Sequence, residues 1–134
     1  MENKGIEVVH SSAAPAPVGP YAQAVRAGAF LFVSGQIPLD PATSQLVTGS
    51  IELQTQRVLD NLGAILDSQG LTFSDVVKTT VYMTDLAEFS RMNEVYARAL
   101  GPARPARATV QVAALPKNAR VEIEAVALCP DRAG

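Results

Sequence analysis

Polar residues that could do chemistry interrupt two apolar segments near the end of the chain. Arg107, Thr109 and Gln111 alternate with apolar residues, so they share one face of an expected strand. Glu122 and Glu124 share one face of the next expected strand by the same rule. An arginine binds a carboxylate through two parallel hydrogen bonds, and a carboxyl group removed from water exchanges protons near neutral pH. The two segments therefore contain the groups needed to hold a small acid and to move a proton.

The two expected strands run from Arg107 to Val112 and from Val121 to Leu128. We expect Ala108 and Val110, on the other face of the first strand, to lie against helices. If the two strands form a hairpin, the arginine and both carboxylates share one neighbourhood, although the period does not fix the register. An Arg–Glu pair on a solvated sheet face is the simpler interpretation and is worth well under about 1 kcal/mol. A partner subunit that excludes water favours a functional site instead.

Other candidate residues carry weaker signals. His10 is the only histidine, so a catalytic histidine pair or a multi-histidine metal site is excluded, and we expect it in an exposed loop. Cys129 is the only cysteine and cannot form an internal disulfide, which indicates a reducing compartment. Tyr21, Ser34 and Gly35 could line a pocket or could serve only as turn residues. No metal-ligand spacing and no glycine-rich nucleotide motif occurs, so we expect neither a metal nor a cofactor.

Composition limits the classes of protein that fit. The 134 residues predict a single domain spanning 1–134, with 48% apolar and 18% charged residues. The formal charge of −2 argues against a general nucleic-acid binder, which needs a basic surface. The start of the chain lacks the apolar core of a secretory signal, and no segment approaches the roughly 18 apolar residues of a membrane span. We therefore expect a soluble cytoplasmic protein with no membrane and no nucleic-acid partner.

The expected elements alternate between strands and helices. Strands are predicted over 29–33, 76–83 and the two segments already described, because these runs are apolar or rich in β-branched residues. A helix is predicted from an N-cap at Ser50 to a C-cap at Gly70, with apolar residues at helical spacing between 51 and 66 forming its buried stripe. A second helix is predicted to begin at Asp85, with Glu88 completing a capping box, and to end at Gly101. Its expected buried stripe consists of Leu86, Phe89, Met92, Tyr96 and Leu100. Residues 11–20 and 38–49 are predicted to be loops.

These elements predict an α+β fold, a mixed β-sheet with two helices packed on one face. The strands around 30–33 and 121–128 are apolar on both faces, so the face without helices would expose a large apolar patch. Soluble monomers rarely tolerate such a patch. We therefore expect symmetric self-association that turns the open faces inward.

The chain resembles the RidA (YjgF-like) family of reactive enamine/imine deaminases over nearly its whole length. The matching motifs are GPY at 19–21, FVSGQIP at 32–38, VKTTVY at 77–82, MNEVY at 92–96, PARATV at 105–110, LPK at 115–117 and VEIEA at 121–125. The resemblance implies a chorismate-mutase-like fold and a homotrimer with clefts between subunits. It also implies hydrolysis of 2-enamino or 2-imino acids, such as 2-aminoacrylate, to 2-keto acids and ammonia.

Residue roles follow from the matching motifs. Arg107 would bind the substrate carboxylate and Glu122 would direct the attacking water. The other substrate-binding residues implied by the motifs are Tyr21, Ser34, Gly35, Asn93 and Thr109. The family often has cysteine at the position of Thr109, and the segment between Tyr96 and Arg107 is short compared with some members, which alters the pocket rim. Three other functions remain: a non-catalytic module that binds small carboxylates, a chaperone-like trimer acting through its outer surface, and a deaminase for one specific catabolic intermediate.

Overall fold

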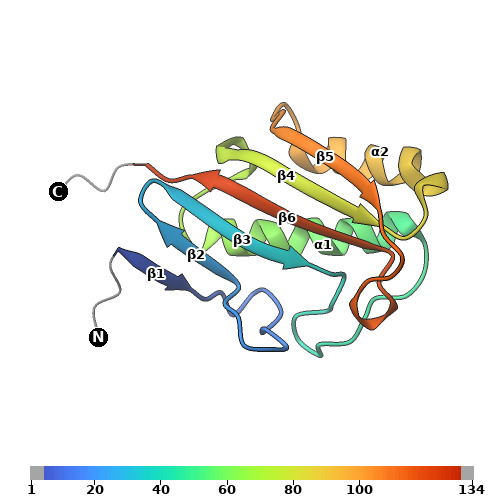
Figure 1. Ribbon diagram of the computed structural model, residues 1–134, viewed down its shortest axis with the longest axis horizontal. Helices are drawn as coiled ribbons and strands as arrows, with labels where there is room; N and C mark the ends of the chain where they lie inside the picture. The colour runs from blue at the N-terminus through green and yellow to red at the C-terminus, as the bar shows by residue number, and fades with distance from the viewer. Residues whose placement is uncertain (1–4, 131–134) are drawn as a thin grey trace.

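The structure is a computed structural model and describes residues 5–130 (Figure 1). Within this range the chain forms one six-stranded sheet, two α-helices and three short 3₁₀ helices. The strands are β1 Ile6–Val9, β2 Ala24–Ala27, β3 Phe30–Gln36, β4 Val76–Met83, β5 Ala106–Gln111 and β6 Val121–Leu128. The helices are α1 Ile51–Asp67 and α2 Phe89–Leu100, with 3₁₀ helices η1 Phe73–Asp75, η2 Leu86–Glu88 and η3 Pro116–Asn118.

The sheet has the strand order β1-β2-β3-β6-β4-β5, and both helices pack on one of its faces (Figure 1). All neighbouring strands are antiparallel except β4 and β5, which are parallel. The parallel pair is connected through α2, as a crossover between parallel strands requires. The predicted α+β fold, with a mixed sheet and helices on one face, is confirmed.

The core lies between the helices and the sheet. The apolar stripe predicted for α1 is buried throughout, and Met92, Tyr96 and Leu100 of α2 pack against the same core, with Phe89 partly buried beside them. Leu86, expected in the same stripe, is exposed because it belongs to the 3₁₀ helix η2. From the sheet, alternate residues of β6 reach this core, with Val121 and Ile123 fully buried. The 3.6-residue period of the helices and the two-residue period of the strands thus meet in one apolar layer.

The predicted helix starts are confirmed in part. The Ser50 side chain accepts a hydrogen bond from the Leu53 backbone, so Ser50 is the N-cap of α1 as expected. Helix α1 ends earlier than predicted, with its C-cap at Ser68, and Gly70 takes a left-handed φ of 71° in the turn that follows.

The predicted start of the second helix is wrong in one detail. Asp85 caps the 3₁₀ helix η2, which leads into α2, and its side chain accepts from the Ala87 backbone. Glu88 does not complete a capping box, because its carboxylate binds Arg91 and Arg120.

The last two strands do not form a hairpin, so the condition for grouping Arg107 with Glu122 is not met. Strand β4 lies between β5 and β6 and pairs with both of them. The sequence also gave no clear signal for the short strands β1 and β2, which extend the sheet beyond β3. The strand predicted over 29–33 is longer in the structure, since β3 continues past a register shift between Val33 and Gln36.

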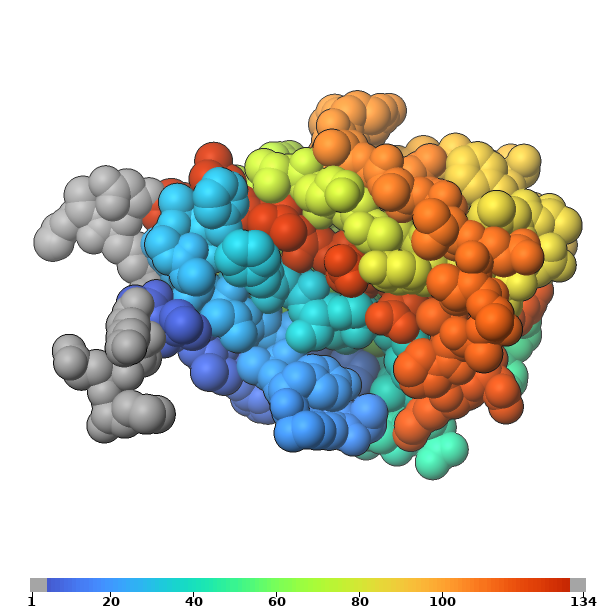
Figure 2. Space-filling view, in the orientation of Figure 1, coloured from blue at the N-terminus to red at the C-terminus, as the bar shows by residue number. Residues whose placement is uncertain are grey.

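The face of the sheet without helices carries exposed apolar side chains on β3 and β6 and polar side chains on β4 and in the first half of β6, and Figure 2 views the molecule from this side. Phe32 pairs with Val126 and Phe30 with Leu128 across β3 and β6, and their side chains project away from the helices. Phe30, Phe32, Leu128 and Val110 are each more than 40% exposed in the single chain. Phe30, Phe32 and Leu128 are neighbours and form an exposed apolar patch on β3 and β6, and exposed apolar patches often mark contact surfaces. Val110 is separated from this patch by Tyr82 and Glu122 in the register of the sheet.

Candidate functional site

The Arg107 side chain is held by three residues of α2. Its Nη1 atom donates to Oδ1 of Asn93 at 2.7 Å. Its guanidinium carbon lies 4.7 Å from the ring centre of Tyr96 and 5.6 Å from that of Phe89. Phe89, Asn93 and Tyr96 follow one another at i, i+4 and i+7, which places them on a single face of the helix. Helix α2 therefore holds the guanidinium by stacking on two rings and by one hydrogen bond, and we call Phe89, Asn93 and Tyr96 the seat of Arg107.

The Tyr96 ring in this seat is itself fixed from the sheet. Its hydroxyl shares a 2.7 Å hydrogen bond with Oγ1 of Thr79, and both side chains are buried. Thr79 lies opposite Arg107 in the β4–β5 register, so strand and helix hold the arginine between them. Such a seat limits the rotamers of Arg107 before any ligand arrives.

This arrangement reverses the expected faces of β5. Arg107 and Thr109 point toward the helix layer and are partly buried, whereas Ala108 and Val110 are exposed on the open face. The apolar residues were expected against the helices because apolar groups usually lie inside. Here β5 is an edge strand whose Arg107 side chain packs on α2, and this leaves Ala108 and Val110 on the open face.

Thr109 follows Arg107 on the same face of β5. Its Oγ1 atom is buried and has no hydrogen-bond partner among the described residues. A buried hydroxyl without a partner is costly. Thr109 therefore offers an unused hydrogen-bonding group near Arg107.

A pocket of about 420 Å³ opens beside Arg107. Its lining comes from the second half of α2 and the loop that leads to β5. Within the described residues, the ion pairs join Arg91 and Arg120 to Glu52 and Glu88 and include none to Arg107. The guanidinium is thus positioned at a pocket with its charge unneutralised, as an anion-binding group requires.

A second pocket, of about 310 Å³, gathers four other predicted residues. Tyr21, Ser34, Gly35 and Glu122 line it, together with Val18, Ile37 and Pro116. The Ser34 hydroxyl donates to the carbonyl of Ala22 at 2.6 Å, so its lone pairs remain available to the pocket. Tyr21 is about half exposed at the rim, and its hydroxyl accepts from the Val18 backbone at 3.3 Å.

Gly35 is needed so that Glu122 can take its position. A Cβ at position 35 would lie only 2.9 Å from Cδ of Glu122, and closer still to Oε2. No side chain fits there unless the carboxyl group moves. The pocket role predicted for Gly35 is therefore steric, since the bare backbone makes room for the carboxylate.

Burial raises the pKa of Glu122 above its ordinary value, and the nearby charge of Glu124 raises it further. Glu124 itself accepts a hydrogen bond from the Tyr82 hydroxyl at 3.2 Å. A carboxylate with a raised pKa is a stronger base toward water than an exposed one. Glu122 can therefore take up a proton within its pocket.

The two pockets lie on opposite faces of the sheet within one chain. Arg107 pairs with Thr79 of β4, and Glu122 pairs with Tyr82 of the same strand. Thr79 and Tyr82 are three positions apart in a regular stretch, so their side chains point to opposite faces. Within a single chain, Arg107 therefore does not share one neighbourhood with Glu122 and Glu124, because the hairpin on which that grouping depended does not form.

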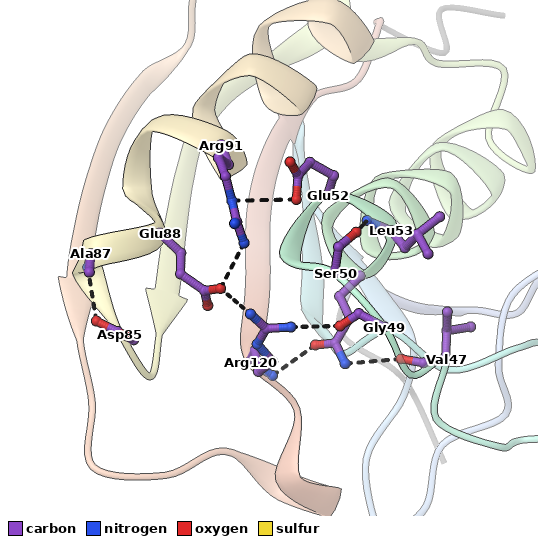
Figure 3. A network of polar contacts seen from close by, with 11 residues as sticks. Val47, Gly49, Ser50, Glu52, Leu53, Asp85, Ala87, Glu88, Arg91 and Arg120 are labelled. Carbon is purple, nitrogen blue, oxygen red and sulfur yellow. Dashed lines mark hydrogen bonds and ion pairs between the residues drawn. The ribbon is translucent and has the colours of Figure 1, made fainter.

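A polar network fixes the start of β6, close to Glu122 (Figure 3). Arg120 contacts the Glu88 carboxylate, donates to the Gly49 carbonyl at 2.6 Å, and is held at its backbone N–H by Gln54. Arg91 joins Glu88 to Glu52. The network ties both helix starts to the strand that carries Glu122, and the sequence analysis did not identify it.

The helical seat of Arg107 was also missed in part. Asn93 came only from the family resemblance, and Phe89 and Tyr96 were assigned to the core stripe. Their spacing along α2 was a usable signal, because a polar residue between two aromatics on one helix face is unusual in a core. His10 is exposed, as expected, and the Cys129 thiol is buried.

Between residues 5 and 130, no helix is long and apolar enough to cross a membrane. No group of three or more His, Cys, Asp or Glu side chains gathers as a metal site in the same range.

Comparison with known proteins identifies the family. Residues 11–129 match the family model described as Endoribonuclease L-PSP. A RutC family protein of Pyrococcus horikoshii is 51% identical over 90% of this chain and 96% of its own. The mouse protein named 2-iminobutanoate/2-iminopropanoate deaminase is 46% identical over 91% and 90%. A solved structure from Thermotoga maritima has a TM-score of 0.90 at 52% identity, covering 93% of this chain and 98% of that one. The chain therefore belongs to the YjgF/RutC/RidA family, whose model is Endoribonuclease L-PSP.

Proposed function

We propose that this protein hydrolyses reactive 2-enamino and 2-imino acids, such as 2-aminoacrylate, to 2-keto acids and ammonia. The observation that carries the proposal is the state of Arg107, which is seated on α2 beside a pocket without a carboxylate partner in the described chain. The name of the mouse relative supports the same reaction. Arg107 binds the substrate carboxylate, and Asn93 lines the same pocket, which forms one wall of the site. Thr109 lies two residues further along β5 and is not among the residues that line this pocket.

The second wall of the site comes from another copy of the chain. Glu122, Tyr21, Ser34 and Gly35 line a separate pocket, so one protomer supplies each wall and neither is complete alone. The apolar open face supports the self-association that this requires. A homotrimer with clefts between its subunits joins the Arg107 wall of one chain to the Glu122 wall of the next.

The reaction then needs only a held substrate and one directed water. The enamine takes a proton at C3 and becomes the 2-imino acid. Glu122 accepts a proton from water while the water oxygen bonds to C2, and the imine nitrogen is protonated. The resulting carbinolamine loses ammonia as its C–N bond breaks and its hydroxyl becomes the keto oxygen. A protonated imine is already electrophilic, so orientation and proton transfer suffice.

A coupled assay tests the proposal. A dehydratase supplies 2-aminoacrylate, and the appearance of pyruvate is followed with and without this protein. We expect faster pyruvate formation with the protein and none of that increase with the Arg107→Ala variant. An unchanged rate, together with saturable binding of small carboxylates, would favour a non-catalytic binding module. Cleavage of single-stranded RNA by the same preparation would instead favour the activity in the name of the family model.

A further inference from the structure

We propose that Arg104 is a second anion-binding group of the Arg107 pocket, so that the site prefers imino acids with a second carboxylate on their side chain. This inference rests on the proposed function and names its substrate class. The substrates would be the 2-imino derivatives of four- and five-carbon dicarboxylic amino acids.

The charge of the pocket carries the inference. Arg104 and Arg107 are its charged lining residues, and within the described chain no carboxylate lines it with them. The remaining lining residues are Asn93, Tyr96, Ala97, Leu100, Ala103 and Pro105. Each guanidinium can bind one carboxylate through paired hydrogen bonds, so two of them around one hollow match the two carboxylates of a dicarboxylate.

The Arg104 side chain is held in place before a ligand binds. Its Nη1 atom donates to the carbonyl of Gly101 at 2.6 Å and to that of Ala103 at 2.8 Å. These bonds leave Nε and Nη2 without a partner in the described residues. Because one edge of the fork is anchored to the backbone, binding an anion at the other edge immobilises less free side chain.

The size of the pocket fits such a ligand. Its volume of about 420 Å³ exceeds what a three-carbon imino acid fills. A substrate whose own carboxylate lies on Arg107 has room to extend its side chain along the wall formed by Ala97 and Leu100. Arg104 precedes β5 and lines the same pocket, so the side-chain carboxylate of a substrate bound at Arg107 can reach the Arg104 guanidinium.

A purely structural role for Arg104 is the competing interpretation. The Gly101 carbonyl belongs to the end of α2, and an arginine that satisfies it stabilises the helix terminus. Arg98 provides the matched control, because it carries the same charge in the last turn of the same helix, is exposed, and does not line the pocket. A general effect of charge near this helix end would appear in variants of both residues.

Calorimetric binding of two keto acids separates these interpretations. The probes are 2-oxoglutarate, which has two carboxylates, and 2-oxobutanoate, which has one. We expect the wild-type protein to bind 2-oxoglutarate at least about tenfold more tightly, Arg104→Gln to lose that preference, and Arg98→Gln to keep it. Arg104→Lys, which keeps the charge but not the fork, should retain part of the preference and guards against a folding defect in Arg104→Gln.

The inference is overturned if the wild-type protein shows no preference, if Arg104→Gln retains it in full, or if Arg98→Gln loses it equally. Ammonia release from the corresponding imines is measured separately. A clear binding preference without ammonia release above the uncatalysed rate would overturn the proposed function and leave the role of Arg104 standing.

Discussion

Two arginines of this chain, Arg107 and Arg120, have opposite surroundings. Arg120 spends its guanidinium on the Glu88 carboxylate and the Gly49 carbonyl, within a network that joins three elements. Arg107 rests on two aromatic rings and one amide oxygen, and its charge is not neutralised within the described chain. The first arrangement stabilises the fold, whereas the second leaves a cation ready for a ligand. The two residues are of the same type, so a structural arginine is distinguished from a ligand-binding one by whether a carboxylate of the protein already neutralises it.

Replacement of Arg107 by alanine tests one side of this comparison and has the largest expected effect. Loss of the carboxylate-binding group should lower kcat/KM for 2-aminoacrylate by at least about a hundredfold, or about 3 kcal/mol. Thermal stability and the size of the assembly should change little, because Arg107 neutralises no internal charge. Arg107→Lys is the control and should recover only part of the activity. A variant with wild-type turnover would remove Arg107 from the site.

A charge on the open face tests whether the two walls must meet. Phe32→Glu places a carboxylate in the middle of the apolar patch, and we expect it to shift the assembly toward monomers in analytical ultracentrifugation. Turnover should fall with the loss of assembly. Leu53→Glu, at an exposed apolar position on α1, is the control and should leave the assembly intact. A Phe32→Glu protein that stays assembled and active would contradict the inward orientation of this face.

Replacement of Arg120 by alanine tests the other side of the comparison. The variant loses the contacts to Glu88 and Gly49, and we expect a decrease of about 1–3 kcal/mol in the free energy of unfolding. Urea denaturation measures this change. Substrate affinity, measured without urea and therefore far from the unfolding midpoint, should remain near that of the wild type. Lost affinity with unchanged stability would place Arg120 in the site and end the contrast with Arg107.

The raised pKa of Glu122 predicts a small effect of pH on stability. Since folding raises the pKa of Glu122, the ionised carboxylate lowers the stability of the folded protein. This penalty is absent below pH 4.5, the ordinary pKa, because the carboxyl group is then protonated in both the folded and the unfolded state. Glu122→Gln cannot ionise, so near pH 7 it should be a few tenths of a kcal/mol more stable than the wild type, a size limited by solvent screening at this half-buried site. The difference should vanish near pH 4 in denaturation curves. A variant that is less stable at pH 7 and equally so at pH 4 would contradict this sign.

Much of the fold was predictable from local pattern. The stripes of α1 and α2, the Ser50 cap and the apolar strands all depend on short-range periodicity, which the sequence displays directly. Strands β1 and β2 were not predicted because a four-residue segment shows too little periodicity to be distinguished from a loop. The position of β4 between β5 and β6 was not predicted because strand order depends on long-range packing, and adjacent segments usually pair.

The site was predictable in its residues more than in its geometry. Arg107 and Glu122 stood out as charges within apolar strands, but their separation onto opposite faces depends on the register through β4. The expected faces of β5 were reversed because the Arg107 side chain packs on the aromatic rings of α2, which leaves Ala108 and Val110 exposed on the open face. The seat formed by Phe89, Asn93 and Tyr96 required knowing which face of α2 meets the edge of the sheet.

Mixed assemblies test most directly whether the two walls come from different chains. Arg107→Ala and Glu122→Gln are each expected to be nearly inactive, and they are denatured, mixed in equal amounts and refolded together. In a mixed ring, an intact Arg107 wall faces an intact Glu122 wall at about a quarter of the interfaces, so about a quarter of the wild-type activity should return. Native mass spectrometry confirms that the assemblies are mixed. Mixed assemblies that remain as inactive as the two parents would contradict a site shared between subunits.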